Sequence, residues 1–358
     1  MTNGLDRAPA LGHKYRNKVV NPGRRTTQSV RLLVTGGAGY VGSNVVWALH
    51  DRGDEVVVYD NLRQGHREAL PATVRLIEAD LADTATLDAT LAEGGWDGVL
   101  HFAALSLVGE SMQRPFHYLQ ENAGLGIGLI DSCVRHGVGR FILSSTAALF
   151  GNPDTTPITE QTRIDPGSPY GESKLMIERA LLWADRIHGL RYACLRYFNA
   201  AGADADGRSG EDHRPETHLI PLVIDAALGL RPEIVVFGDD YPTADGTCIR
   251  DYVHVSDLAQ AHLAALGRLD DGSVTYNLGS GTGHSVLEVI RSVERVSGHA
   301  VPMRIVDRRP GDPAILVASA ARIRDETGWT PRYTALDDIV ATALAWRRAH
   351  PNGYGNEG

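Results

Sequence analysis

Residues 31–42 read RLLVTGGAGYVG: an apolar run stops at a glycine-rich turn, and a helical pattern then continues to about residue 52. A strand, a glycine turn and a helix in this order are the context in which a phosphate-binding fingerprint functions. The glycines let the backbone turn tightly and approach a pyrophosphate, whose charge is met by amides at the helix N-terminus. The sequence therefore predicts a dinucleotide site at Gly36, Gly39 and Gly42.

The next predicted strand, residues 55–59, ends in Asp60. A carboxylate at about this spacing accepts hydrogen bonds from the adenine ribose hydroxyls of a bound dinucleotide. The same negative charge repels a 2′-phosphate. We therefore expect NAD as the cofactor, in preference to NADP.

Strands and helices continue to alternate beyond Asp60. Strands are expected near residues 74–77, 99–103, 140–146 and 191–198, and helices near residues 84–92, 116–136 and from Tyr170 onwards. This alternation indicates βαβ units and a parallel sheet. We expect an α/β protein whose NAD-binding domain, residues 30–199, is a Rossmann-type doubly wound parallel sheet.

The pattern loosens after residue 199, where loops rich in glycine and aspartate become frequent. We expect residues 200–350 to form a smaller mixed α/β lobe that closes over the substrate, with segments returning to the first domain, and residues 351–358 to form a C-terminal tail. Residues 1–29 carry six lysines and arginines against one aspartate and contain no apolar signal region. We exclude them from the fold as a flexible basic tail, a remote start or an expression remnant.

One edge of the predicted sheet should collect the ligand-binding residues, because open α/β sheets bind ligands beyond the carboxyl ends of their strands. The residues expected to gather there are Gly36, Asp60, Asp80, Phe102, Thr146, Tyr170 and Asn199. Their convergence is stronger evidence than any single motif.

Tyr170 and Lys174 are four residues apart at the start of a predicted helix, which places both side chains on one helical face. A phenol with a pKa of about 10 is a poor base at neutral pH, but a neighbouring cation favours its phenolate form. Tyr170 can then take a proton from a substrate hydroxyl while an oxidised cofactor accepts the hydride. Taken alone, the two residues would be an ordinary surface pair, and the case for catalysis depends on the dinucleotide site upstream.

The composition narrows the function classes. The chain has 358 residues, of which 43% are hydrophobic and 22% charged, and it contains no apolar run as long as a membrane span. We expect a soluble protein without a membrane partner. A net charge of -9 argues against nucleic-acid binding, which depends on a basic surface.

The three cysteines are odd in number and far apart, which favours a reduced cytoplasmic protein over a disulfide framework. The histidines, including His101, His254 and His262, are scattered without the spacing of metal ligands. We therefore expect no metal site.

Further motifs identify a family. They are TGGAGYVGSN at 35–44, YDNL at 59–62, HFAA at 101–104, VGES at 108–111, SPYGESK at 168–174, LRYFNAAGA at 195–203, FGDDYPTADGTCIRDYVHVSDLA at 237–259 and RPGDPA at 309–314. With these motifs, residues 30–350 resemble the extended short-chain dehydrogenase/reductase superfamily and, within it, the UDP-glucose 4-epimerase family.

The resemblance implies a redox-neutral cycle. Tyr170 would take the proton from the sugar 4-hydroxyl while hydride passes to NAD⁺, and the 4-keto sugar would turn over before hydride returns to its opposite face. Thr146 matches the family's hydroxyl residue beside the reacting oxygen. Lys174 would hold the nicotinamide ribose and lower the pKa of Tyr170. Family members are usually homodimers, so we expect a homodimer by analogy.

The resemblance also assigns binding positions. Those for the cofactor are Gly36, Gly39, Tyr40, Val41, Gly42, Asp60, Asn61, Asp80, Leu81, Phe102, Ala103, Ala104, Asn122, Tyr170 and Lys174. Those for the UDP-sugar are Thr146, Asn199, His218, Leu219, Val235, Phe237, Arg250, Tyr252, Arg309, Asp312 and Leu316. Arg250 and Arg309 are the expected diphosphate ligands, because a guanidinium fork pairs well with phosphate oxygens.

The chain departs from the family at several of these positions. Ser106 stands where a lysine is common, Phe150 where a tyrosine is common and His218 where an asparagine is common. The residue that gates N-acetylated sugars maps to Leu316. A large tyrosine there implies glucose and galactose alone and a small residue implies acetamido sugars too, so leucine leaves both substrate ranges open.

Three alternatives were weighed against this family. A nucleotide-sugar 4,6-dehydratase would need acidic residues after the catalytic threonine, whereas Thr146 is followed by Ala147 and Ala148, which cannot act as acid or base. Epimerases of other UDP-sugars share the same machinery and stay open. A catalytically silent NAD-binding regulator would not need Thr146, Tyr170 and Lys174 together.

Overall fold

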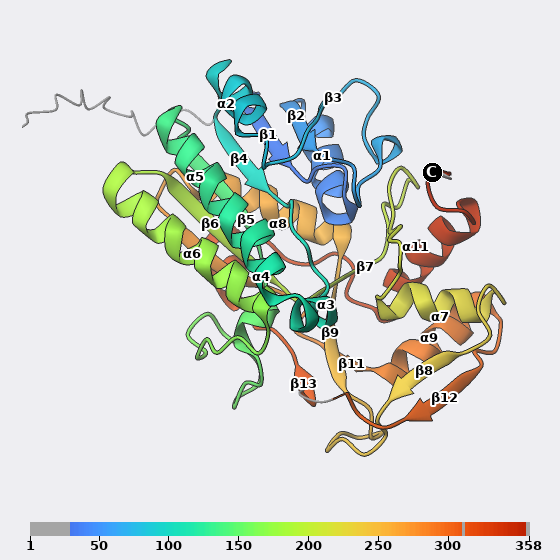
Figure 1. Cartoon of the computed structure of the whole chain (residues 1–358). Coiled ribbons are helices and arrows are strands. Elements are labelled where there is room, and N and C mark those ends of the chain that lie inside the picture. Colours follow the sequence, from blue (N-terminus) through green and yellow to red (C-terminus); the bar gives the residue numbers. More distant parts are fainter. Residues whose placement is uncertain (1–28, 310–311, 356–358) are drawn as a thin grey trace, which may run out of the picture.

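The computed structural model describes residues 29–309 and 312–355. The basic tail expected over residues 1–29 therefore lies, except for its last residue, outside the described residues. Figure 1 shows two parts, a large sheet flanked by helices and a smaller lobe of short strands and helices.

The large part is built on a seven-stranded sheet in the order β10-β6-β5-β4-β1-β2-β3. Every neighbouring pair is parallel, which confirms the predicted doubly wound α/β fold. The strands are β1 (Arg31–Thr35), β2 (Glu55–Asp60), β3 (Arg75–Glu78), β4 (Gly98–His101), β5 (Arg140–Thr146), β6 (Arg191–Tyr197) and β10 (Val274–Leu278).

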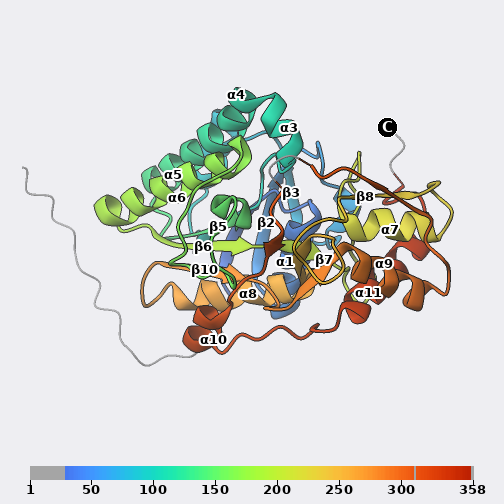
Figure 2. The same cartoon turned by 90° about the horizontal axis from the view of Figure 1, so that it is seen from below.

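Helices cover both faces of this sheet, as Figure 2 shows. Successive residues of a strand point to opposite faces, so in β1 Leu32 and Val34 enter one core while Leu33 enters the other. The first core is closed by α1 (Tyr40–Arg52), α8 (Val255–Arg268) and α10 (Ala321–Thr327). The second is closed by α2 (Thr84–Ala92), α5 (Leu125–Arg135) and α6 (Pro169–His188).

Local sequence sets the ends of α6, the helix that carries Tyr170 and Lys174. The Ser168 side chain accepts a hydrogen bond from the backbone N–H of Gly171, and Pro169 occupies the first helical position. The helix ends at Gly189, which adopts a left-handed conformation with φ 74°. These are the residue types that favour a helix start and a helix stop.

The single helix expected over residues 116–136 is wrong in detail. The structure has α4 (Pro115–Tyr118), a π-helical segment η2 (Leu119–Gly124) and then α5. The amide group of Asn122, within the π segment, bonds both to the backbone of Leu105 and to the hydroxyl of Ser173. We infer that these long-range contacts favour the wider turn, which the local helical pattern does not encode.

The smaller lobe is a mixed α/β unit. Its central strand β9 (Ile249–His254) pairs antiparallel with β11 (Gly283–Ser285) and parallel with β7 (Asn199–Ala201) and β13 (Ile315–Leu316). A separate parallel pair joins β8 (Ile234–Phe237) to β12 (Met303–Val306). One apolar core holds the lobe's helices, α7 (Leu219–Ala227), α9 (Val286–Ser297) and α11 (Leu336–Ala349). The remaining short elements are η1 (Arg67–Ala69), α3 (Val108–Gln113) and η3 (Ala147–Phe150).

The chain passes between the two parts more than once. After β9 it returns to the large sheet as α8 and β10, and α10 returns again. The described C-terminal residues pack on the lobe, because the Tyr354 hydroxyl and the backbone of Gly210 exchange hydrogen bonds and the Tyr354 N–H donates to Asp212.

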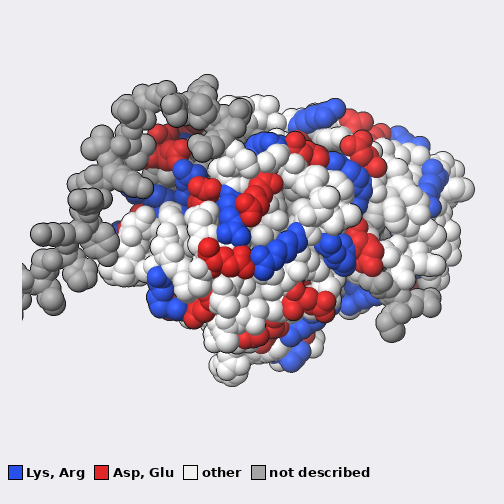
Figure 3. Space-filling model, turned by 90° about the horizontal axis from the view of Figure 1, so that it is seen from above, with Lys and Arg blue, Asp and Glu red and all other residues white. Residues whose placement is uncertain are grey.

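Charges of both signs intermingle on the face in Figure 3. Exposed ion pairs such as Arg75 with Glu93 (2.8 Å) and Arg135 with Asp88 (2.8 Å) typify this surface chemistry. No described helix is long and apolar enough to cross a membrane.

Candidate active site

Thr146, Tyr170 and Lys174 come together at the carboxyl edge of the large sheet. Thr146 is the last residue of β5, and the other two lie in the first turns of α6. The hydroxyl of Thr146 hydrogen-bonds the phenol of Tyr170. Gly171 permits this approach, because a Cβ atom there would lie 2.5 Å from the carbonyl oxygen of Ala148.

Burial is the largest influence on the pKa values of Tyr170 and Lys174. Burial raises the pKa of Tyr170, and the hydrogen bond from Thr146 partly offsets that rise. The Nζ of Lys174 donates a hydrogen bond to the carbonyl oxygen of Ser144 at 2.9 Å. Burial lowers the pKa of Lys174 to about 8. The effect of Lys174 on the Tyr170 pKa stays a prediction.

A buried ion pair between α6 and β6 lies next to the catalytic trio. Glu178 lies one helical turn beyond Lys174, and its carboxylate accepts hydrogen bonds from Arg196 at 2.9 and 2.6 Å. It also accepts one from the hydroxyl of Ser145 at 2.6 Å. These contacts join α6 to β5 and β6 directly beside Thr146. These contacts were not predicted, because packing brings Ser145, Glu178 and Arg196 together from three separate elements.

The glycine turn after β1 fits a dinucleotide pyrophosphate. Gly36 has φ 71°, and a Cβ atom there would lie 2.3 Å from the backbone nitrogen of Ala103. A Cβ atom at Gly42 would lie 2.3 Å from the carbonyl oxygen of Gly36, whereas one at Gly39 would meet only that oxygen, at 3.4 Å. Gly39 also begins α1 without a side-chain cap from the described residues, so the first amides of the helix can bind an anion.

Asp60 stands at the end of β2 beside this turn. Its carboxylate accepts hydrogen bonds from the backbone N–H groups of Ala38 and Leu62, each at 2.9 Å. Each carboxylate oxygen has a further lone pair, so the group can still accept from ribose hydroxyls. Two further predicted cofactor positions contact each other, because the side-chain amide of Asn61 donates a hydrogen bond to the carboxylate of Asp80 at 2.7 Å. The site thus fits the adenosine half of the cofactor.

The loop after β4 carries Phe102, Ala103 and Ala104 along the same edge. Asn122 holds this loop, since its amide donates to the Leu105 carbonyl oxygen (2.9 Å) and accepts from the Leu105 N–H (2.8 Å). The structure thus places the predicted cofactor positions at the carboxyl ends of β1 to β4, in η2 and in the first turns of α6. Asn122 is satisfied by protein groups and orients the wall of the site.

The two predicted diphosphate ligands lie on strand β9, for Arg250, and in the segment after β12, for Arg309. Arg250 on β9 forms an ion pair with Asp312 and donates to the carbonyl oxygen of Ile249 at 2.8 Å. The guanidinium carbon of Arg309 lies 3.8 Å from the ring centroid of Phe237. Along β8, Val235 and Phe237 share the half-exposed side, while the alternating residues are buried.

Leu316 links the lobe to the catalytic strand. It pairs in register with Arg250. Its side chain also packs against the apolar cluster of Ala147, Phe150 and Ile158, two of which lie in the turn that follows Thr146. The predicted gate residue therefore lies between the diphosphate positions and the catalytic trio.

The other predicted substrate positions lie near the junction of the two parts. Asn199 pairs in register with Tyr252, and its amide donates to the carbonyl oxygen of Asp251 at 3.0 Å. His218 and Leu219 are at the start of α7, where His218 forms an ion pair with Glu211. The hydroxyl of Tyr40 reaches this junction from the glycine turn and donates to the carbonyl oxygen of Gly202 at 2.6 Å.

Comparisons with known proteins agree with this geometry. Residues 32–279 match the family model described as the NAD dependent epimerase/dehydratase family. A UDP-glucose 4-epimerase of Halalkalibacterium halodurans is 48% identical over 91% of this chain and 98% of its own. A crystal structure of a UDP-glucose 4-epimerase aligns with TM-score 0.89 and 47% identity, covering 91% of this chain and all of the other.

A third relative was solved with ligands. The UDP-glucose 4-epimerase of Bifidobacterium longum, in complex with NAD⁺ and UDP, aligns with TM-score 0.86 and 38% identity and covers 90% of this chain and all of the other. The matches span nearly the full length of these enzymes, and the glycine turn and Asp60 provide the site that their cofactor requires. The chain therefore belongs to the NAD dependent epimerase/dehydratase family and, within it, groups with the UDP-glucose 4-epimerases.

Proposed function

We propose that the protein interconverts UDP-glucose and UDP-galactose by inverting the configuration at carbon 4 of the hexose, with NAD as its cofactor. The observation that supports this most directly is the meeting of Thr146, Tyr170 and Lys174 at the carboxyl edge of the sheet. Membership of an NAD-dependent family of epimerases gives the reaction class. Residues 30–199 form the NAD-binding unit and residues 200–350 supply the UDP-sugar lobe, with α8, α10 and β10 returning to the first.

Tyr170 acts as the proton acceptor from the sugar 4-hydroxyl and later returns the proton. Thr146 donates a hydrogen bond to the phenol oxygen, which favours its negative form. NAD⁺ bound at the glycine turn and Asp60 would supply the hydride acceptor for carbon 4 and the hydride donor for the return step, with no net oxidation. Lys174 is buried at the base of the trio and binds the nicotinamide ribose. The 4-keto sugar rotates between the two hydride transfers and presents its other face.

The lobe anchors the UDP group while the sugar turns. Arg250 and Arg309 bind the diphosphate, and the carboxylate of Asp312, which pairs with Arg250 here, accepts hydrogen bonds from the ligand. The half-exposed side of β8 contacts the ribose and uracil. The remaining contacts come from Asn199, His218, Leu219, Val235, Phe237 and Tyr252.

The pocket admits hexoses with and without an acetamido group. Leu316 packs on the turn after Thr146, and its side chain is shorter than a tyrosine and lacks a hydroxyl. Its flexible isobutyl group leaves room for the substituent on carbon 2. We therefore propose UDP-N-acetylglucosamine and UDP-N-acetylgalactosamine as secondary substrates.

The assembly is a homodimer and its compartment the cytoplasm. Large apolar side chains are exposed along neighbouring elements of one layer, on α3 to α6: Met112, Phe116, Ile127, Met176, Trp183 and Ile187. A face of this kind is typical of an interface between subunits. All three cysteines are free and buried, in agreement with a reducing compartment.

Turnover of the purified protein on UDP-galactose and UDP-N-acetylgalactosamine, side by side and without added cofactor, tests the proposal. We expect conversion of both, the first faster. Conversion of UDP-galactose alone would restrict the substrate range. Turnover of neither by protein that contains NAD would overturn the substrate assignment.

A further inference from the structure

Two histidines and two glutamates converge in the loop that leads into α7. The ligand atoms of Glu211, His213, Glu216 and His218 all lie within 4.8 Å of one another. His213 Nδ1 is 3.3 Å from Glu211 Oε1 and 3.6 Å from Glu216 Oε2, and His218 Nδ1 contacts Glu211 Oε1. Donor atoms of a tetrahedral zinc site are about 3.3 to 3.5 Å apart, which follows from bonds of about 2.0 to 2.1 Å. We propose that these four residues form a binding site for a divalent transition-metal ion, with Zn²⁺ as the best match.

The donor set suits this class of ion. Neutral imidazole and carboxylate ligands favour zinc and its neighbours over calcium or magnesium, which prefer a shell of oxygen atoms. Two carboxylates also neutralise the charge of a divalent ion. The four residues lie within eight positions of the chain, so little ordering of distant segments is needed to assemble them.

The loop is held in place by groups outside the cluster. Glu216 Oε1 accepts hydrogen bonds from the N–H groups of Thr217 (2.7 Å) and His218 (2.8 Å), which leaves Oε2 for a ligand. The neighbouring side chains of Asp212 and Arg214 contact the C-terminal segment. Asp212 accepts a hydrogen bond from the Tyr354 N–H, and Arg214 donates one to the backbone carbonyl oxygen of residue 352. Outer contacts of this kind orient metal ligands.

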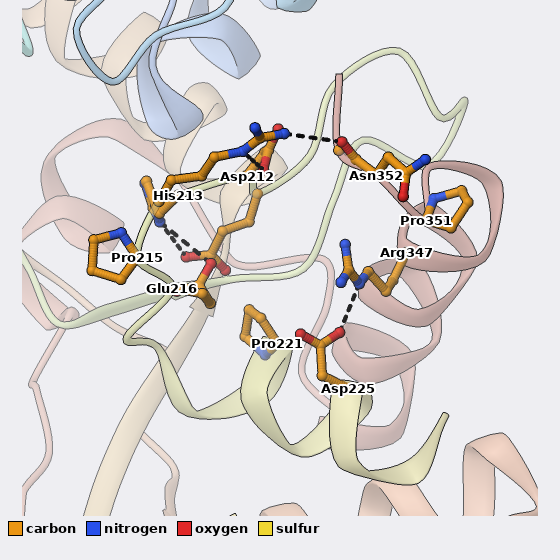
Figure 4. A pocket seen from close by; sticks show the side chains of 12 residues that line it. Asp212, His213, Pro215, Glu216, Pro221, Asp225, Arg347, Pro351 and Asn352 are labelled. Atoms are coloured by element: carbon orange, nitrogen blue, oxygen red, sulfur yellow. Dashed lines mark hydrogen bonds and ion pairs between the residues drawn. The ribbon is translucent and has the colours of Figure 1, made fainter. Parts of the chain in front are cut away.

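A cavity of about 420 Å³ adjoins the cluster and gives an ion a path from solvent. Figure 4 shows His213 and Glu216 directed at one another on its wall, with the ion pair between Asp225 and Arg347 on the other side. The cluster also contacts the first domain, since the rings of His213 and Tyr40 meet edge to face with centroids 6.1 Å apart. An ion bound here would stabilise the contact between Tyr40, which follows the glycine turn, and the lobe.

The competing explanation is an ion-paired network without metal. Burial by itself would lower the pKa of His213, but hydrogen bonds and charge from Glu211 and Glu216 raise it to about 10. A protonated imidazole cannot bind a metal ion through the same nitrogen. Binding of a divalent ion must therefore displace these protons, and direct measurement of bound metal separates the two explanations.

The test uses the full chain, without a histidine tag and with its NAD retained, after dialysis against a chelator. Addition of Zn²⁺ alone, followed by removal of excess and elemental analysis, should return one zinc per chain. Co²⁺ alone should give the visible absorption of a tetrahedral site. The variants His213→Ala and His218→Ala should each weaken binding by more than about 100-fold, because loss of a direct ligand exceeds the effect of an outer contact.

His299→Ala is the matched control, since His299 is exposed and lies after α9, outside the cluster. It should bind zinc as the parent protein does. Circular dichroism and NAD content establish that each variant is folded. Absence of stoichiometric metal from the parent protein, or equal binding by the folded His218→Ala variant, would overturn the metal site. Neither result bears on epimerase turnover, so the two proposals fail independently.

Discussion

Lys174 Nζ lies 2.9 Å from the carbonyl oxygen of Ser144, the residue two positions before Thr146 on β5. The two other lysines of the sequence are Lys14 and Lys18, so Lys174 is the one lysine in the part of the chain that the structure describes. It is also among the most buried side chains, with 1% exposed. A cation is thus fixed against the catalytic strand, and its titration can be followed without interference from another lysine of the fold.

Lys174 should make a contribution to the stability of the NAD-free protein that increases with pH. Burial lowers its pKa from 10.5 to about 8, so between these values the unfolded chain binds more protons than the folded one, and the free energy of unfolding increases with pH. Because each pKa unit corresponds to about 1.36 kcal/mol, the shift from 10.5 to about 8 gives a total increase of roughly 3 kcal/mol. Urea unfolding of the parent protein and of Lys174→Met, each at pH 7 and pH 10, measures it as a difference, because the buried thiols have raised pKa values and contribute a loss of stability over the same range. Lys174→Met should remove this increment, and an unchanged pH dependence in that variant would contradict the assignment.

Replacement of Tyr170 by phenylalanine should abolish proton transfer and leave the cofactor in place. General acid–base catalysis contributes about 10²- to 10⁴-fold, so kcat should fall by that factor. Tyr197→Phe is the matched control, because Tyr197 is partly buried on the neighbouring strand β6 and contacts the hydroxyl of Ser144. It should lose far less activity. Equal losses in the two variants would mean that Tyr170 is no more than part of the packing.

The two glycines of the turn should respond differently to alanine. At Gly39 a methyl group meets only the Gly36 carbonyl oxygen, at 3.4 Å, so the fold should survive while the methyl group blocks the pyrophosphate. Gly39→Ala should therefore keep its melting temperature in the absence of NAD and lose NAD. In Gly42→Ala the methyl group would lie 2.3 Å from the carbonyl oxygen of Gly36, so both the melting temperature and the NAD content should fall.

Gly267→Ala provides the control for these substitutions. Gly267 is an exposed residue of α8, and a Cβ atom added there would meet no heavy atom within 4 Å. Alanine should therefore stabilise the helix by about 0.5 to 1 kcal/mol. Calorimetry and the NAD content of all three proteins give the comparison. Retention of NAD by Gly39→Ala would place the pyrophosphate elsewhere.

Glu178→Gln should destabilise the protein strongly. The variant leaves the guanidinium of Arg196 buried without its carboxylate, and breaking a buried ion pair costs about 3 to 5 kcal/mol. Replacement of both residues by apolar side chains should restore much of the stability, because no buried charge of this pair then remains. Denaturant unfolding of the single and double variants measures the difference. A loss in the single variant well below the ~3 kcal/mol expected for a buried pair would show that solvent reaches it.

Leu316→Tyr should narrow the substrate range. The larger side chain extends from β13 toward the turn after Thr146, where it competes with the acetamido group for space. The ratio of kcat/KM for UDP-galactose over UDP-N-acetylgalactosamine should rise by about tenfold or more. Leu316→Val is the matched control and should leave the ratio near that of the parent protein. No change with tyrosine would remove Leu316 from the pocket.

The sequence predicted those features that local pattern controls. The apolar run before Gly36 and the start of a helix at Tyr170 can be recognised from neighbouring residues. The parallel sheet and the helix that carries Tyr170 and Lys174 were therefore predicted. The π-helical segment was not predicted, because it depends on hydrogen bonds between Asn122 and distant groups of the chain. The pKa of Tyr170 depends on burial, and the pairing of Glu178 with Arg196 depends on packing, so neither was visible in spacing alone.

The route of the chain has a consequence for how the protein can be divided. β10 closes the large sheet beside β6, yet it comes from residues 274–278, after most of the lobe. A fragment that ended near residue 200 would leave β6 as a bare edge with unpaired amides and would expose the apolar face that α8 covers. Such edges recruit other chains and aggregate. The two parts should therefore fold and unfold as one cooperative unit, and attempts to express the nucleotide-binding part alone should yield insoluble material.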